Sequence, residues 1–135
     1  MVGTILTIAL VAAGCVTAAF SLYLLALAVV DQPRPSPDLV RVVGNLSTSA
    51  FPSGHETTFT SVLGFLGYLG SRRGPLSRGL SVLGVAACLA VMAWARLYQG
   101  QHWLSELLGG FCLGCCWLAT TILIYRRLRS SRRGS

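Results

Sequence analysis

Residues 2–30 form a stretch without a charged side chain, and this stretch constrains the fold more than any other feature of the chain. At about 1.5 Å per helical residue it could cover about 40 Å, which is enough to cross a bilayer with tilt to spare. A cleaved signal peptide would show a basic start, a shorter apolar run and a clear cleavage site of small residues, and none of these is convincing here. We therefore interpret the stretch as a retained transmembrane helix.

Three further apolar stretches follow at residues 55–70, 79–95 and 103–125, with polar connections between them. The chain is 53% hydrophobic and only 11% charged, which is too apolar for an ordinary soluble domain. We see no internal repeat and no second domain. The sequence predicts an all-α fold, a polytopic membrane helical bundle of about four transmembrane helices over residues 1–125, followed by a basic tail at residues 126–135.

Arginines set the predicted topology. The formal net charge of +7 comes from eleven arginines and no lysine, and most of them lie in the connection at residues 71–78 and in the tail. Basic connections of membrane proteins lie in the cytoplasm. The connections at residues 31–56 and 96–102 then share the outer face. Neither a folded soluble module nor interleaved aromatic residues accompany the arginines, so we expect no nucleic-acid partner.

This topology brings the only two histidines, His55 and His102, to one membrane face together with Arg34 and Arg96. Arginine offers forked donors that match phosphate oxygens, and the free N–H groups at a helix start favour anions. A neutral imidazole can attack phosphorus, and a second one in its charged form can protonate a leaving oxygen. These residue types therefore point to phosphate chemistry at the outer face of the cell membrane.

His102 and Glu106 are four residues apart, so they lie on one face if the fourth helix starts near His102. The carboxylate could then accept the Nδ1 proton and leave Nε2 free to attack, as in the histidine–carboxylate half of a catalytic triad. The pair fits equally well a polar cap at the membrane interface, with Trp103 as an interfacial aromatic residue. The pair alone does not separate these two interpretations.

The five cysteines lie inside apolar segments, where thiols behave as small hydrophobic groups. Cys112, Cys115 and Cys116 imitate a metal-binding spacing, but no second cluster completes such a site. We expect neither a metal site nor a disulfide framework. Cysteine usage does not indicate a redox compartment.

Three short motifs resemble those of the type 2 phosphatidic acid phosphatase superfamily, which includes lipid phosphate phosphatases and bacterial undecaprenyl pyrophosphate phosphatases. The second family motif, Pro-Ser-Gly-His, is matched in full by residues 52–55. The third, Ser-Arg, five residues, His, three residues, Asp, is matched with its spacing intact by Ala95, Arg96, His102 and Glu106. The first, Lys, six residues, Arg-Pro, is half present as Arg34-Pro35, with Leu27 in place of the lysine.

The resemblance implies a role for each matched residue. His102 would be the nucleophile that forms a phosphohistidine, Glu106 its orienting carboxylate, and His55 the acid that protonates the leaving group. The phosphoryl oxygens would be held by Arg34, Arg96, Ser53 and the backbone N–H of Gly54. The implied substrate is a lipid phosphate or pyrophosphate, such as phosphatidic acid or a polyprenyl pyrophosphate, and no metal or cofactor is implied.

The chain departs from the family pattern in several places. Leu27 supplies no cation, Glu106 is one methylene longer than the family aspartate, and Ala95 lacks the family hydroxyl. Members usually have six transmembrane helices, and this chain resembles the last four. The packing surface of the other two would then face lipid, a homo-oligomer or a missing-helix partner.

These departures motivate an alternative from another class, a catalytically impaired family member that binds lipid phosphates or serves as a membrane partner. A structural membrane protein with accidental motifs is a third interpretation. A vanadate-using haloperoxidase, from a more distant branch, is disfavoured because those relatives are typically larger and soluble.

Overall fold

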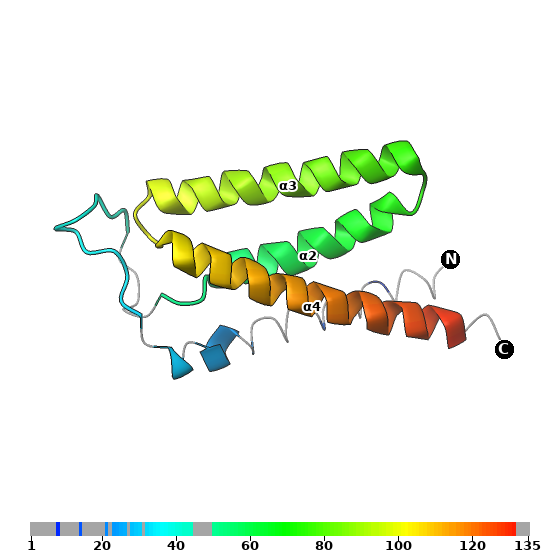
Figure 1. Cartoon of the computed structure of the whole chain (residues 1–135), viewed down its shortest axis with the longest axis horizontal. Coiled ribbons are helices and arrows are strands. Elements are labelled where there is room, and N and C mark those ends of the chain that lie inside the picture. Colours follow the sequence, from blue (N-terminus) through cyan, green and yellow to red (C-terminus); the bar gives the residue numbers. More distant parts are fainter. Residues whose placement is uncertain are drawn as a thin grey trace.

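The structure is a computed structural model of the whole chain, and Figure 1 shows its arrangement. It describes residues 8, 14, 21, 23–26, 28–30, 32–44 and 50–131. Three α-helices have described bounds: α2 (Gly54–Ser71), α3 (Pro75–Tyr98) and α4 (Leu104–Ser131). The described residues between positions 8 and 29 are helical as well. They fall inside the predicted first span, whereas Leu27 lies outside the described residues.

Helix α2 is the central element of the described bundle, because it contacts both α3 and α4. The short connection at Arg72–Gly74 turns the chain back, so α3 runs antiparallel to α2 (Figure 1). Pro75 opens α3, a position where the missing proline N–H costs no helical hydrogen bond. The start of α2, the end of α3 and the start of α4 consequently lie at one end of the molecule (Figure 1).

Small residues allow α2 and α4 to pack closely. A Cβ on Gly110 would come within 2.6 Å of the Ser53 carbonyl oxygen, and one on Gly114 within 2.9 Å of the Thr57 carbonyl oxygen. The buried side chains of α2 are largely polar, and two of them donate to backbone carbonyls: Thr57 Oγ1 to the Ser53 oxygen at 3.0 Å, and Ser61 Oγ to the Thr57 and Gly114 oxygens at 2.7 and 3.3 Å. This close approach therefore fixes the position of the N-terminal end of α2 relative to that of α4.

Helices α3 and α4 are long and apolar enough to cross a membrane, with mean hydropathies of 1.9 and 2.0 over their most apolar windows. No residue of α3 is buried within the protein, and its large apolar side chains face outward. Such a helix suits a lipid environment, because apolar side chains need no protein partner there. Helix α3 is longer than the predicted span at residues 79–95, because the helix continues through the flanking polar turns.

Helix α4 continues to Ser131, beyond the predicted end of the span at residue 125. Arginine is a good helix former, and arginines in a last turn interact favourably with the negative end of the helix dipole. Arg126, Arg127 and Arg129 are therefore helical rather than part of a separate tail. Residues 132–135 lie outside the described residues.

The connection from α3 to α4 requires glycine at position 100. Gly100 has a φ of 62°, in the left-handed region, and a Cβ there would lie 2.5 Å from the Arg41 carbonyl oxygen. Both the backbone conformation and the close approach exclude a larger side chain. The tight turn delivers Gln101 and His102 directly to the start of α4.

Candidate functional site

A cavity of about 350 Å³ opens at the end of the molecule where α2 and α4 begin. Its walls come from the N-terminal helical segment, the connection at residues 32–44, α2, and the end of α3 with the following turn. The lining residues are Tyr23, Arg34, Gly54, His55, Thr58, Phe59, Arg96, Gln101 and His102. Five of the seven predicted site residues, all except Ser53 and Glu106, thus line one cavity.

His102 is oriented by Glu106. The Nδ1 atom of His102 lies 2.7 Å from Glu106 Oε2, and the two side chains are 5% and 0% exposed. His102 precedes α4 by two residues, yet the contact forms because the Glu106 carboxylate folds back over the helix start. The same oxygen accepts the backbone N–H of Trp103 at 3.1 Å, as a carboxylate in the first turn of a helix commonly does. The longer glutamate side chain is thereby held in one position.

The second ring nitrogen of His102 faces Arg34. Arg34 Nη1 lies 3.5 Å from His102 Nε2 and donates to the Gln101 carbonyl oxygen at 2.7 Å. With its Nδ1 proton held by Glu106, the imidazole carries its lone pair on Nε2, beside a guanidinium group. Burial and the positive charges of Arg34 and Arg96 lower the pKa of His102 from 6.5 to about 4. The ring is therefore neutral at physiological pH.

His55 enters the cavity from the second position of α2 and is exposed to solvent. Helix α2 begins at Gly54, so the N–H groups of Gly54 and His55, which both line the cavity, have no carbonyl partner within the helix, whereas those of Glu56 and Thr57 donate to Ser53. The positive end of the helix dipole adds to the two arginines at this place. A tetrahedral anion in this cavity would therefore have two guanidinium groups, the free N–H groups at the start of α2 and two imidazole rings among its neighbours.

Ser53 lies behind the cavity rather than on its wall. Its side chain is fully buried, and its Oγ accepts the Glu56 N–H at 3.4 Å as the N-cap of α2. Its own N–H donates to the Glu106 carbonyl oxygen at 3.0 Å. Ser53 therefore joins the start of α2 to the start of α4, and its side chain does not line the cavity with the other predicted phosphate-binding groups.

Gln101 is the main residue of the site that the motifs do not identify. It is 9% exposed and holds both arginines: its backbone oxygen accepts from Arg34, and its side-chain Oε1 accepts from Arg96 Nη1. Its Nε2 donates to the Val43 carbonyl oxygen at 3.0 Å. A polar residue directly before the motif histidine is the only sequence signal for this role.

Two aromatic residues complete the cavity. The ring of Tyr23 packs so closely on Gly54 that a Cβ at position 54 would come within 3.0 Å of it. Phe59 borders the cavity one helical turn below His55. Among the described residues, no group of three or more histidine, cysteine, aspartate or glutamate side chains is arranged to hold a metal ion.

Comparison with known proteins gives a family match. The model of the PAP2 superfamily matches residues 2–130. The chain belongs to the PAP2 superfamily. This membership confirms the resemblance deduced from the three motifs.

Two PAP2 relatives can be compared directly. A putative undecaprenyl-diphosphatase of Escherichia coli K12, YbjG, is 39% identical over 90 residues, which cover 60% of this chain and 41% of that protein. The crystal structure of a transmembrane PAP2-type phosphatidylglycerolphosphate phosphatase from Bacillus subtilis matches with a TM-score of 0.77 at 19% identity, covering 87% of this chain and 59% of that one. The chain thus spans about half the length of these relatives. The structural match confirms the predicted all-α membrane bundle.

Proposed function

We propose that this PAP2 member is a metal-independent membrane phosphatase that hydrolyses a lipid phosphate or pyrophosphate through a phosphohistidine. The observation that carries the proposal is the 2.7 Å contact between His102 Nδ1 and Glu106. This contact leaves Nε2 as the basic nitrogen of a neutral ring inside a cavity that also holds two arginines and a second histidine. Together these groups meet the needs of phosphoryl transfer.

In the first step, the guanidinium groups of Arg34 and Arg96 and the N–H of Gly54 bind the phosphoryl oxygens. His102 Nε2 attacks phosphorus, and the bond from phosphorus to the leaving oxygen breaks as that oxygen takes a proton from His55. The His102 ring becomes positively charged, and the Glu106 carboxylate stabilises this charge through the Nδ1 proton. The arginines stabilise the charge that develops on the phosphoryl oxygens.

In the second step, His55 is neutral and accepts a proton from water. The resulting hydroxide attacks phosphorus, the phosphorus–nitrogen bond breaks, and inorganic phosphate leaves. His102 recovers its lone pair and His55 its proton, so the enzyme returns to its starting state. In this scheme arginine charge serves the purpose for which other phosphatases use a metal ion.

The substrate class follows from the site and its relatives. The names of the two relatives describe phosphatases of an undecaprenyl diphosphate and of phosphatidylglycerolphosphate. In this chain, Tyr23 and Phe59 give the cavity an apolar side next to its cationic groups. We propose that this side accommodates the first part of a lipid chain, while the phosphate lies between the arginines.

We further propose that the site faces the outside of the cell membrane and that the arginine-rich end of α4 faces the cytoplasm. Cysteine-accessibility labelling of a Ser130→Cys variant, made in a background without native cysteines, tests this orientation in intact cells. If an impermeant reagent labelled the Ser130→Cys variant before lysis, the α4 end would lie outside the cell and the proposed orientation would be wrong.

The proposed activity is tested with the full chain in lipid nanodiscs. Phosphate release from phosphatidic acid and from a polyprenyl pyrophosphate is measured in the presence of EDTA, with and without vanadate. We expect turnover in EDTA, inhibition by vanadate, and loss of turnover in His102→Ala. Full activity in His102→Ala would refute the mechanism.

The departures from the family pattern motivate a second candidate function, a catalytically impaired protein that binds lipid phosphates or serves as a membrane partner. Leu27 and Glu106 replace the lysine and aspartate of the motifs, and position 27 lies outside the described residues. The double variant Leu27→Lys with Glu106→Asp separates the two functions. A large gain from near-zero activity supports the impaired protein, whereas high activity in the wild type excludes it.

A further inference from the structure

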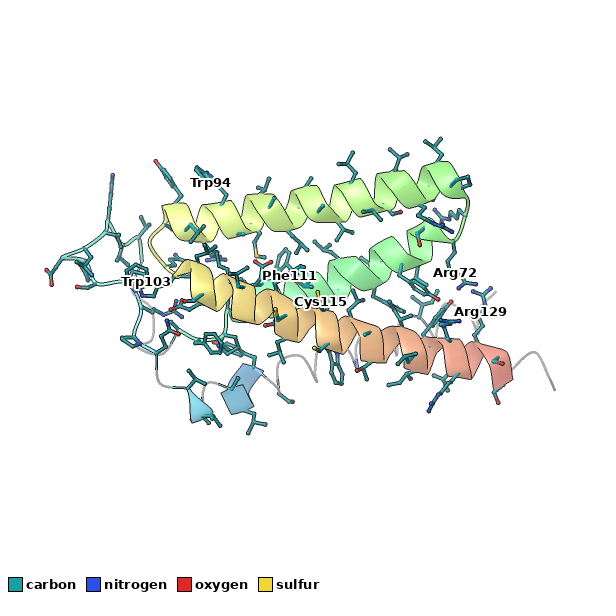
Figure 2. All side chains as sticks on the ribbon, in the orientation of Figure 1. Arg72, Trp94, Trp103, Phe111, Cys115 and Arg129 are labelled. Carbon is teal, nitrogen blue, oxygen red and sulfur yellow. The ribbon has the colours of Figure 1, made fainter. Side chains whose placement is uncertain are left out.

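The opposite end of the bundle carries a second cavity, far from the site described above. It has a volume of about 220 Å³ and is lined by Arg72, Tyr125, Arg126, Arg129 and Ser130. We refer to it as the far-end arginine pocket. Arg72 comes from the end of α2 and the others from the last turns of α4, so two helices build it. Figure 2 shows Arg72 and Arg129 beside each other at this end, with Trp103 at the other.

Tyrosine hydroxyls orient two of the three guanidinium groups. Arg72 Nη1 donates to Tyr68 Oη at 2.9 Å, and the Arg72 guanidinium carbon lies 5.7 Å from the centre of the Tyr68 ring. Arg129 Nη1 donates to Tyr125 Oη at 3.2 Å. A tyrosine hydroxyl accepts a hydrogen bond without neutralising the cation. The arginines are thus positioned while they keep their full charge.

The tyrosines are themselves held by packing. Tyr125 is 4% exposed, and its ring meets those of Phe65 and Tyr68 edge-on at centre distances of 5.5 and 6.2 Å. Aromatic side chains packed in this way have little rotational freedom. The pocket therefore has a rigid aromatic floor beneath its charged rim.

No described carboxylate compensates this charge. Glu56 and Glu106 lie in the first turns of α2 and α4, and Glu106 is about 30 Å along the helix from Arg126. Asp38 belongs to the connection at the catalytic end, where Val43 bonds to the Gln99 carbonyl oxygen. The separation of Glu106 from the pocket arginines exceeds the screening length of about 8–10 Å at physiological ionic strength, and the other described carboxylates lie at the same end as Glu106. The carbonyl ends of α2 and α4 offset only part of the charge.

We propose that the far-end arginine pocket binds a phosphate group, supplied by an anionic lipid head group at that membrane surface or by free phosphate. Arginine's planar fork matches phosphate oxygens, and three such groups around one cavity can contact several of them. The positive-inside rule explains why arginines occur at this end. It does not require that tyrosines packed against each other orient guanidinium groups from two helices around a cavity.

The test compares two double variants that each remove two charges from this end. Arg72→Gln with Arg129→Gln changes the pocket, whereas Arg73→Gln with Arg78→Gln changes exposed arginines that do not line it. Full-length protein in phosphatidylcholine nanodiscs is titrated with a fluorescent phosphatidylglycerol, whose phosphodiester differs from the proposed substrates. A separate titration with inorganic phosphate is followed by phosphorus NMR.

We expect the pocket variant to weaken binding of one probe by about tenfold or more and the control to change it less than twofold, because each lost fork removes charge-assisted bonds. Loss of phosphatidylglycerol binding identifies a lipid head group, and loss of inorganic phosphate binding identifies free phosphate. Equal losses in both variants, or no binding of either probe to the wild type, would overturn the proposal.

Tyr125→Phe provides a second, milder test, because it keeps the ring packing and removes only the acceptor that orients Arg129. Circular dichroism verifies that helix content is unchanged. We expect severalfold weaker binding of the same probe. Wild-type binding in Tyr125→Phe would show that the hydroxyl does not organise the pocket and would overturn the preorganised site.

Discussion

Gln101 provides the sharpest prediction about the catalytic end. It fixes Arg34 through its backbone oxygen and Arg96 through its side-chain oxygen. The substitution Gln101→Leu removes only the second of these contacts, because the backbone carbonyl remains. The variant also loses the hydrogen bond from Gln101 Nε2 to the Val43 carbonyl oxygen. Val43 is exposed, so water can replace this donor. The loss therefore falls mainly on the orientation of Arg96.

The magnitude follows from the type of contact. A hydrogen bond to a charged group contributes about 1.5–3 kcal/mol, and about 1.4 kcal/mol corresponds to a tenfold change in rate. Arg96 remains in place but loses its fixed direction, so we expect kcat/KM to fall about 10- to 100-fold. Arg96→Gln, which removes the charge altogether, should lose more.

The assay is steady-state phosphate release by the full chain in nanodiscs. Gln99→Leu is the matched control, because it is the same substitution two residues away at a side chain that does not line the cavity. Gln101→Leu is also combined with Arg96→Gln. If Gln101 acts through Arg96, its substitution should cost little in that background, since residues that act as a unit are not additive.

Two results would refute this reasoning. In the first, Gln101→Leu keeps the kcat/KM of Gln99→Leu, so the side-chain contact has no consequence. In the second, Gln101→Leu costs as much in the Arg96→Gln background as in the wild type, so Gln101 acts by another route.

Three further predictions concern protonation, the triad-like pair and helix packing. The lowered pKa of His102, about 4, keeps the ring neutral above that pH, so the acidic limb of kcat/KM should lie near 4, and an acidic limb near 6.5 in the pH–rate profile would contradict this; on the alkaline side kcat/KM should fall as His55, the proposed acid, loses its proton. Glu106→Gln removes the charge that stabilises the protonated His102 ring and should lower kcat roughly 10²- to 10⁴-fold with little change in KM, measured by steady-state kinetics. Gly110→Ala drives a Cβ against the Ser53 carbonyl and should lower the free energy of unfolding by about 1–3 kcal/mol, whereas Gly84→Ala, whose Cβ meets nothing within 4 Å, should raise it by up to about 1 kcal/mol in detergent denaturation.

The helical part of the fold was predictable because apolar composition and length largely decide which segments cross a membrane. The helix expected at residues 55–70 corresponds to α2 at Gly54–Ser71, since the Pro-Ser-Gly turn supplies its N-cap, although α2 is not among the described helices that are apolar enough to cross a membrane. The ends of α3 and α4 were less predictable. Hydropathy marks the apolar part of a helix, whereas arginine-rich turns continue the helix without any apolar signal.

The site residues were predictable to different degrees. The spacing of His102 and Glu106 suggested a contact if the helix began at His102. Helix α4 begins at Leu104, and the contact forms because the carboxylate folds back to the helix start. Ser53 matched its motif in full, yet its hydroxyl caps α2 behind the cavity. A motif identifies residue types, but the helix geometry decides where each side chain points.

By itself, the sequence determined the all-α membrane class, the helical segments and the histidine, arginine and carboxylate groups that point to phosphate chemistry. Those properties depend on hydropathy and residue type, which are local. Only the tertiary structure decided that Gln101 joins the two arginines, that Tyr23 packs on Gly54 at the cavity wall, and that Arg72 and Arg129 line one cavity at the far end. These arrangements join residues that lie far apart in the sequence, and the far-end arginine pocket in particular needs the packing of α2 on α4 that Gly110 and Gly114 allow.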